Sequence, residues 1–104
     1  FSPDNKSSKL NIFKKCETLT INILSKKQQL VSNNFAKKNP DWKDIDYYSL
    51  KNGNPIIKNC VSNLDCKIID KIKKGDHIIF ICQVSQVINN DKLKPLIYYN
   101  SKYI

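Results

Sequence analysis

The chain has 104 residues, enough for one small domain with one hydrophobic core. Hydrophobic residues make up 40% and charged residues 26%, which excludes a disordered chain, and no apolar run approaches the roughly 20 residues that a membrane-spanning helix needs. The net charge is +9, and every basic side chain is a lysine. The sequence is dominated by Lys, Asn and Ile, which is typical of codon bias. Because arginine is absent, the charge supports nucleic-acid binding only weakly.

The cysteines and the start of the sequence give three further expectations. The cysteines at positions 16, 60, 66 and 82 form no CxxC pair, and His77 is the only histidine in the sequence, so we expect no metal site. Free thiols in apolar, strand-like stretches favour a reducing, cytoplasmic location. The sequence contains no Met and opens on FSPDNKSS, so we expect the natural protein to extend upstream.

The first polar loop is SPDNKSSK, residues 2–9. It offers an amide, an ammonium and two hydroxyls, from Asn5, Lys6, Ser7 and Ser8. Together with backbone N–H groups, these donors could wrap a phosphate or a diphosphate. The loop has no glycine, so it is neither a P-loop nor a Rossmann fingerprint. A polar surface turn is the alternative interpretation.

A strand followed by a helix is predicted next. Residues 17–24 alternate strictly, which predicts a half-buried strand with Leu19, Ile21 and Ile23 on one face and Thr18, Thr20 and Asn22 on the other. Ser25 and Gln28 have the spacing of a capping box. Residues 26–38 then predict a helix whose inner face carries Leu30, Val31 and Phe35.

The middle of the chain predicts a loop and then a long β segment. Residues 39–55 are rich in turn formers and carry three aromatic side chains, Trp42, Tyr47 and Tyr48. Residues 55–72 predict one long β segment, in which one face carries Leu64, Cys66 and Ile68. The sequence KKGD, residues 73–76, predicts a turn.

The last third predicts two further strands. Residues 77–88 form a long strand with His77, Ile79 and Ile81 on one face and Ile78, Phe80 and Cys82 on the other. After a turn at residues 89–91, a short strand ends in the tyrosines Tyr98, Tyr99 and Tyr103, which could pack a barrel rim or stack on a planar ring. The whole order indicates a mainly β, small barrel with an attached helix.

His77 follows a Gly-Asp turn and stands at a strand entrance, where a ligand could reach it. A lone histidine has a structural role as often as a functional one. The chemistry of His77 therefore leaves open whether it contacts a ligand or only ends a turn. The acidic residues lie mostly in turns and form no acid/base couple, so nothing indicates a hydrolase.

Taken together, seven segments resemble the flavin reductase-like family, in that family's order. They are DNKSSK, TINIL, QQLVSNNFA, PDWKDIDYY, NLDCKIIDKI, KKGDHIIFICQV and PLIYYNSKY. The resemblance covers nearly the whole chain and is most specific at the Gly-Asp-His opener. It implies a small split β-barrel with Greek-key topology and one or two attached helices, of which residues 1–104 form the C-terminal two-thirds.

The resemblance also implies a homodimer with flavin near the interface, and roles for eight residues. The candidate phosphate or ribityl contacts are Asn5, Lys6, Ser7 and Ser8. Asn22 is expected near the isoalloxazine with Phe35 beside it. His77 is the candidate catalytic residue near the nicotinamide, and Tyr103 is the terminal aromatic at the same mouth.

By that resemblance, the chain is an NAD(P)H-dependent flavin reductase. It would transfer hydride from NADH or NADPH to FMN or FAD and supply reduced flavin to a partner monooxygenase. An FMN-binding flavoprotein module without free-flavin reductase activity is the first alternative. A basic nucleic-acid-binding β-barrel is the second, and the absence of arginine counts against it. We therefore expect no nucleic-acid or membrane partner.

Overall fold

The computed structural model describes residues 1–104 except residues 5 and 8. In that part of the chain the helices are α1 (Leu10–Lys15) and α2 (Gln29–Phe35). The strands are β1 (Thr18–Ile23), β2 (Tyr47–Ser49), β3 (Pro55–Ile57), β4 (Ser62–Lys74), β5 (His77–Asn89), β6 (Tyr98–Tyr99) and β7 (Lys102–Tyr103). Strands thus predominate, as predicted, and no helix among the described residues is long and apolar enough to cross a membrane.

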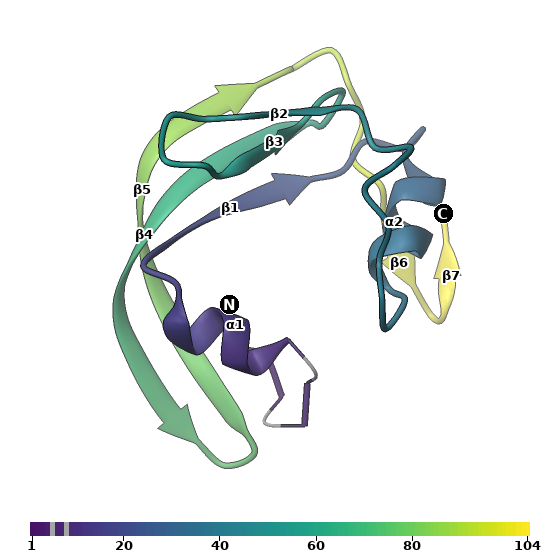
Figure 1. Ribbon diagram of the computed structural model, residues 1–104. Helices are drawn as coiled ribbons and strands as arrows, with labels where there is room; N and C mark the ends of the chain where they lie inside the picture. The colour runs from purple at the N-terminus through teal and green to yellow at the C-terminus, as the bar shows by residue number, and fades with distance from the viewer. Residues whose placement is uncertain (5, 8) are drawn as a thin grey trace.

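A three-stranded antiparallel sheet in the order β1-β4-β5 forms the frame of the domain. The sheet curves strongly, and α1 lies within the curve (Figure 1). Two register shifts between β4 and β5, at Asp65/Cys66 and Ile68/Asp70, accompany the curvature. Bulges of this kind increase the local twist and bend the strand that carries them.

The tip of the β4–β5 hairpin is the turn that the KKGD sequence predicts. Lys74 pairs with His77, so the loop has two residues, Gly75 and Asp76. Gly75 has φ +56°, a backbone conformation that residues with a Cβ rarely adopt. The turn therefore fixes where β5 begins and places His77 at its first position.

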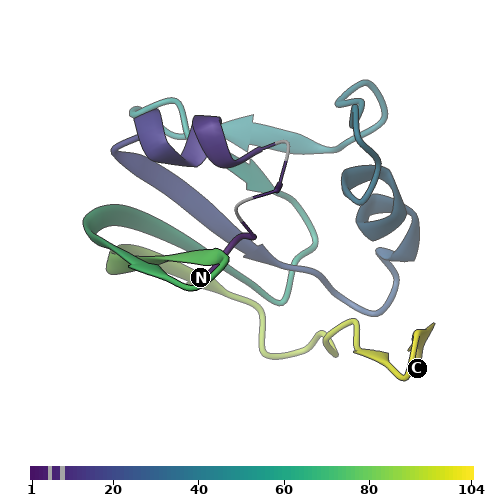
Figure 2. The same cartoon turned by 90° about the horizontal axis from the view of Figure 1, so that it is seen from below.

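A hydrophobic cluster of the core lies between α1 and the part of this sheet nearest the β4–β5 turn. Leu10, Ile78 and Phe80 are buried together, and Phe80 is only 1% exposed. Phe1 stacks on Phe80 with ring centroids 5.0 Å apart, and Phe13 packs edge-on at 6.1 Å. The first residues run beside β5, where Phe80 N–H donates to the Phe1 carbonyl at 2.8 Å. Figure 2 shows the N-terminus against the β4–β5 hairpin.

The β2–β3 hairpin covers the polar face of β1. The Thr18 hydroxyl lies 3.4 Å from Asn54 Oδ1, and Asn54 Nδ2 donates to Asp65 Oδ1 at 2.8 Å. The half-buried character predicted for β1 is confirmed, but burial does not alternate between its two faces. Residues 18–22 are all half-buried and Ile23 is 42% exposed, and the hairpin contacts the hydroxyl and amide face.

The structure also corrects five predictions. Residues 39–55, predicted to form a loop, contain strand β2. Helix α1 was not predicted, and α2 is shorter than residues 26–38, with Leu30 exposed rather than inward. The β segment 55–72 is interrupted by a turn in which Asn59 has φ +65°, a conformation that asparagine tolerates well. The closing strand is a hairpin, β6–β7, whose turn residues also have positive φ.

The four cysteines are free, as predicted. Cys60 and Cys66 are buried, and burial raises the pKa of both thiols. A raised pKa keeps a thiol protonated at neutral pH, so these two cysteines act as small apolar residues in the core.

Candidate functional site

His77 stands at the tip of the β4–β5 hairpin with its side chain 42% exposed. Its Nδ1 atom lies 2.7 Å from Oδ1 of Asp76. This hydrogen bond, followed by one within Asp76 to its own backbone, holds the pKa of the Asp76 carboxyl below its usual value. The turn thus presents a half-exposed imidazole whose ring orientation is set by its neighbour in the sequence.

The N-terminal polar loop begins beside this histidine. Asp4 forms a β-bridge with His77, and its carboxylate accepts a hydrogen bond from the Lys6 N–H at 2.7 Å. Ser7 N–H donates to the Asp4 carbonyl at 2.9 Å, which closes a turn. Lys6 is exposed and Ser7 is half-buried, so both could reach a ligand. The other two loop predictions, Asn5 and Ser8, lie outside the described residues.

Asp4, Asp76 and His77 place one potential metal-ligand atom each within 4.8 Å of one another. The carboxylates already accept the hydrogen bonds described above, and Asp76 is exposed. Spacing is thus the only feature of this cluster that points to a metal.

Asn22 has a different setting from the one expected of a flavin contact. Its Oδ1 atom accepts hydrogen bonds from Asn63 Nδ2 at 2.6 Å and from the Ile57 N–H at 3.2 Å. These bonds join β1 to β3 and β4. Within this chain, the Asn22 side chain therefore connects the sheet to the β2–β3 hairpin.

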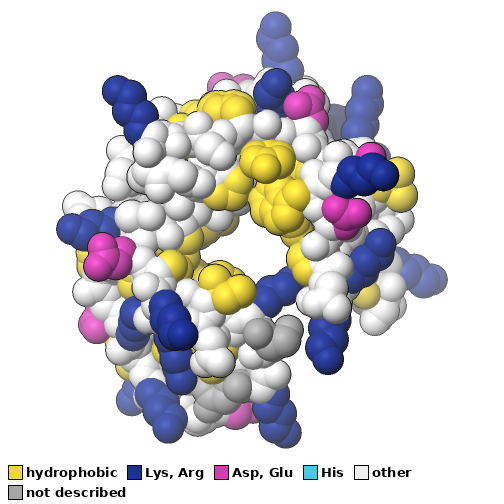
Figure 3. All heavy atoms as spheres, in the orientation of Figure 1, with side chains coloured by type: hydrophobic (Ala, Val, Ile, Leu, Met, Phe, Trp, Pro, Cys, Tyr) yellow, Lys and Arg dark blue, Asp and Glu magenta, His cyan; other side chains and the backbone are white. Residues whose placement is uncertain are grey.

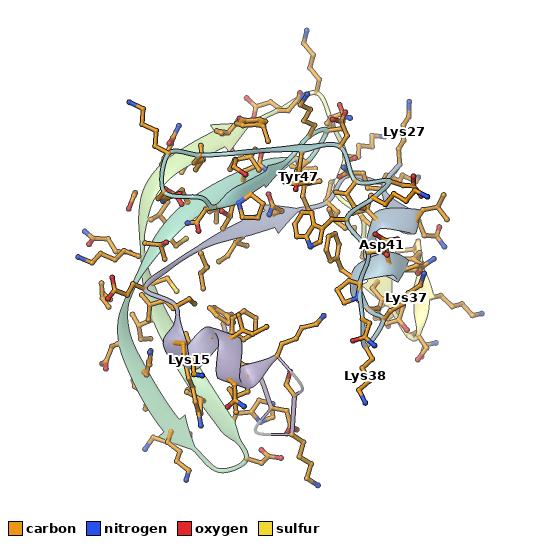
Figure 4. All side chains as sticks on the ribbon, in the orientation of Figure 1. Lys15, Lys27, Lys37, Lys38, Asp41 and Tyr47 are labelled. Atoms are coloured by element: carbon orange, nitrogen blue, oxygen red, sulfur yellow. The ribbon has the colours of Figure 1, made fainter. Side chains whose placement is uncertain are left out.

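Phe35, the last residue of α2, begins a row of three aromatic rings. Trp42 packs edge-on against Phe35 with centroids 4.9 Å apart, and Tyr47 packs against Trp42 at 4.7 Å. The space-filling view shows an opening between α1 and α2 that is bordered by hydrophobic side chains (Figure 3). Figure 4 places Asp41 on the α2 side of this opening and Tyr47 above it, near the end of β1.

A pocket of about 660 Å³ lies between α1 and α2. It is lined by Lys9, Ile12, Phe13, Phe35, Lys38, Asn39, Pro40 and Trp42. Aromatic and aliphatic walls suit a planar ring, and the Lys38 ammonium suits an attached anion such as a phosphate. The residues present therefore fit a flavin nucleotide in chemical type.

Tyr103 lies on the other side of α2. Its hydroxyl is 2.8 Å from the Ser32 Oγ atom and donates to Asn33 Oδ1 at 3.1 Å. Figures 1 and 2 both place β7 far from the β4–β5 hairpin that carries His77. The predicted common mouth of Tyr103 and His77 is thus not formed within the described part of one chain.

Of the eight residues that line the pocket, the sequence predicted only Phe35 as a site residue, and Lys9 and Trp42 illustrate why. Lys9 was treated only as the last residue of a polar loop, and Trp42 only as an aromatic residue of a later loop. Neither belongs to a recognisable motif, and they lie 33 positions apart in the sequence, so only the tertiary structure brings them to one pocket. No spacing pattern in the sequence indicates that Lys9 and Trp42 are close in space.

A comparison with protein families decides where the chain belongs. The family model for the flavin reductase like domain matches residues 1–104. The chain belongs to the flavin reductase-like family. A flavin reductase of Pseudomonas putida is 30% identical over 104 residues, covering 99% of this chain and 61% of that protein. The FMN reductase (NADH) RutF of Pantoea ananatis is 30% identical over 90 residues, covering 84% of this chain and 47% of RutF.

Two solved structures of similar sequence have the same fold. Nitrilotriacetate monooxygenase component B, a homologue from Mycobacterium thermoresistibile, has a TM-score of 0.90 at 30% identity, covering all of this chain and 60% of its own. The flavin reductase PheA2 has a TM-score of 0.86 at 28% identity, covering 99% of this chain and 66% of PheA2. The prediction of a mainly β, split-barrel fold is confirmed. This flavin reductase-like chain spans about half to three-fifths of the curated relatives named above.

Proposed function

We propose that this chain is part of an NAD(P)H-dependent flavin reductase, which transfers hydride from NADH or NADPH to FMN or FAD. The observation that carries the proposal is the match of residues 1–104, the full chain, to the flavin reductase-like domain. Proteins of similar sequence that are named FMN reductase (NADH) and flavin reductase support the same reaction class.

A bound flavin would supply the redox chemistry by accepting hydride from the nicotinamide. The residues of this chain would bind and orient the two nucleotides. Lys6 and Ser7, together with Asn5 and Ser8 of the same loop, would contact the flavin phosphate or ribityl chain. The aromatic wall formed by Phe35 would border the ring system, and holding the two rings at reacting distance would supply most of the rate.

His77 would orient the nicotinamide. Its Nδ1 atom is held by Asp76 at 2.7 Å, which leaves Nε2 as the ring atom that can meet a substrate. The half-exposed side chain at the strand entrance supports this role, because a ligand can approach it from solvent. The assignment of Asn22 as a flavin contact is the least supported, because its amide already bonds to β3 and β4.

A homodimer is part of the proposal. His77 and Tyr103 lie at separate ends of one chain, so a second copy would be needed for both to border one nicotinamide site.

A partner monooxygenase is proposed as the acceptor of reduced flavin, since one relative of this chain is named as the reductase subunit HsaB of a flavin-dependent monooxygenase. A cytoplasmic location is proposed as well, because the reaction draws on reduced nicotinamide nucleotides and the cysteines are free.

Steady-state consumption of NADH by the full-length protein, with and without excess free FMN, tests the proposed reaction. We expect NADH consumption that depends on FMN, and visible bleaching of the flavin when oxygen is excluded. A protein that binds FMN but consumes no NADH would contradict the reductase and favour the flavoprotein module. A protein that binds no flavin, and binds oligonucleotides in a strongly salt-dependent way, would contradict both. Light scattering of the purified protein tests the dimer.

A further inference from the structure

Lys9 makes a hydrogen bond across the pocket between α1 and α2. Its Nζ atom donates to the carbonyl oxygen of Phe35 at 2.9 Å, and the contact is partly buried. The two residues are 26 positions apart in the sequence. Among the described residues, this is the only hydrogen bond between residues 1–15 and residues 25–46.

The backbone of Lys9 is held in place by its own hydrogen bonds, while its side chain reaches the Phe35 carbonyl. Its N–H donates to the Ser7 Oγ atom at 3.3 Å, so it is tied to the loop proposed to hold phosphate. Its carbonyl accepts hydrogen bonds from the N–H groups of Ile12 at 3.1 Å and Phe13 at 3.3 Å, which begin α1. The side chain therefore extends from a well-anchored position.

The Phe35 carbonyl is a favourable acceptor for this ammonium. It belongs to the last turn of α2, where the carbonyl groups lack partners within the helix. A cation near the C-terminus of a helix also interacts favourably with the partial negative charge there. Helix α2 has no basic residue in its own last turn, so Lys9 supplies that charge from a distant segment.

We propose that Lys9 is a positioning residue of the flavin site, which holds the loop of Lys6 and Ser7 at a set distance from α2 and Phe35. The inference rests on the proposed function. The Lys9 side chain acts through the Phe35 carbonyl in the pocket wall, and its backbone N–H is bonded to Ser7 of the loop that is proposed to contact flavin. Without the link, no hydrogen bond among the described residues would join residues 1–15 to residues 25–46.

The test compares Lys9→Met and Lys9→Arg with the wild-type full-length protein. Lys15→Met is the matched control, because Lys15 is the exposed last residue of α1, the helix that Lys9 precedes, and lies on the side away from α2 (Figure 4). The first measurement is amide hydrogen exchange of a peptide spanning residues 29–40, without flavin. The second is the split between KM for FMN and kcat with NADH.

For Lys9→Met we expect exchange in the last turn of α2 to be roughly two- to tenfold faster, the range that the loss of one hydrogen bond predicts. We expect KM for FMN to rise by a similar factor, with kcat within about twofold. Lys9→Arg should restore both values, since a guanidinium can still donate to the carbonyl. Lys15→Met should match the wild type.

Unchanged exchange in Lys9→Met would overturn the link itself. Faster exchange with an unchanged KM would overturn the positioning role and leave Lys9 as a structural residue. An equal effect of Lys15→Met would show that net charge is responsible, and would also overturn the proposal. A wild-type protein that oxidises no NADH in the presence of FMN would contradict the proposed function, while the exchange comparison would still decide whether Lys9 holds α2.

Discussion

The Nδ1 atom of His77 lies 2.7 Å from Oδ1 of Asp76, the second residue of the two-residue turn that begins β5. Asp76 of the turn therefore fixes the orientation of the His77 ring, which the same turn exposes. Because both residues are set by one tight hairpin, the position of the imidazole depends on local geometry rather than on distant packing. This makes the pair a suitable place to test the site.

Replacement of His77 by Ala should slow NADH oxidation by the full-length protein. We expect kcat/KM for NADH to fall about tenfold or more, because a misplaced nicotinamide loses reacting geometry. The affinity for FMN should stay within about twofold, since the proposed flavin contacts come from other side chains. Steady-state kinetics and a fluorescence titration with FMN measure the two effects. Turnover equal to the wild type would rule out this role, and His77→Gln serves as the control that keeps a polar side chain.

Asp76 should titrate below the usual value of an aspartate. The hydrogen bond from His77 stabilises the ionised carboxyl, so its pKa is depressed in the folded state. The resulting stabilisation is present at pH values above the unfolded pKa and is lost as the pH falls through the lower folded pKa. NMR titration of the carboxyl in wild type and His77→Ala checks this. A pKa that does not rise in the variant would contradict the stated cause.

Replacement of Phe80 by Ala should destabilise the fold. The ring is 1% exposed and packs against both Phe1 and Phe13, so its removal leaves a cavity among residues that cannot all collapse. We expect a loss of about 3–5 kcal/mol in the free energy of unfolding, measured by denaturant titration. Tyr99→Ala is the control, because Tyr99 is 70% exposed and should change stability by about 0.5 kcal/mol or less. Equal effects of the two would refute this account of the core.

Tyr103→Phe should loosen the β6–β7 hairpin. The hydroxyl bonds to Ser32 and Asn33 on α2, and each lost hydrogen bond costs about 0.5–1.5 kcal/mol. We expect faster amide exchange in residues 97–104, with the stability of the sheet unchanged. The matched control is Tyr98→Phe, whose hydroxyl has no hydrogen bond among the described residues and whose side chain is largely exposed. Exchange that stays the same in Tyr103→Phe would mean that other contacts hold the hairpin.

Local patterns predicted the elements that local physics determines. The alternation in residues 17–24 and 77–88 gave two strands correctly, because side chains on a strand alternate between faces. The spacing of Ser25 and Gln28 was also informative. Gln28 Oε1 accepts a hydrogen bond from the Ser25 N–H at 2.9 Å, as in a capping box. The helix itself begins only after Gln28, at Gln29. The Gly-Asp turn was predicted correctly for the same local reason.

Burial was harder to predict, because it depends on what covers each face. Leu30 was expected to face inward and is 83% exposed, while the polar face of β1 is covered by the β2–β3 hairpin. A hydrophobic pattern indicates which face prefers burial, but it does not say which distant segment arrives there. Helix α1 was missed because its six residues are too few for a clear helical period.

The sequence by itself determined the strand-rich fold, the hairpin that ends at His77, and the polar loop at the start, since each follows from turn chemistry and side-chain alternation. The tertiary structure alone decided which of these features meet. In the tertiary structure the loop lies beside His77, Tyr103 lies on the far side of α2, and the Lys9 ammonium contacts the Phe35 carbonyl. These contacts join residues distant in the sequence, and long-range packing and hydrogen bonding have no local pattern from which they can be predicted.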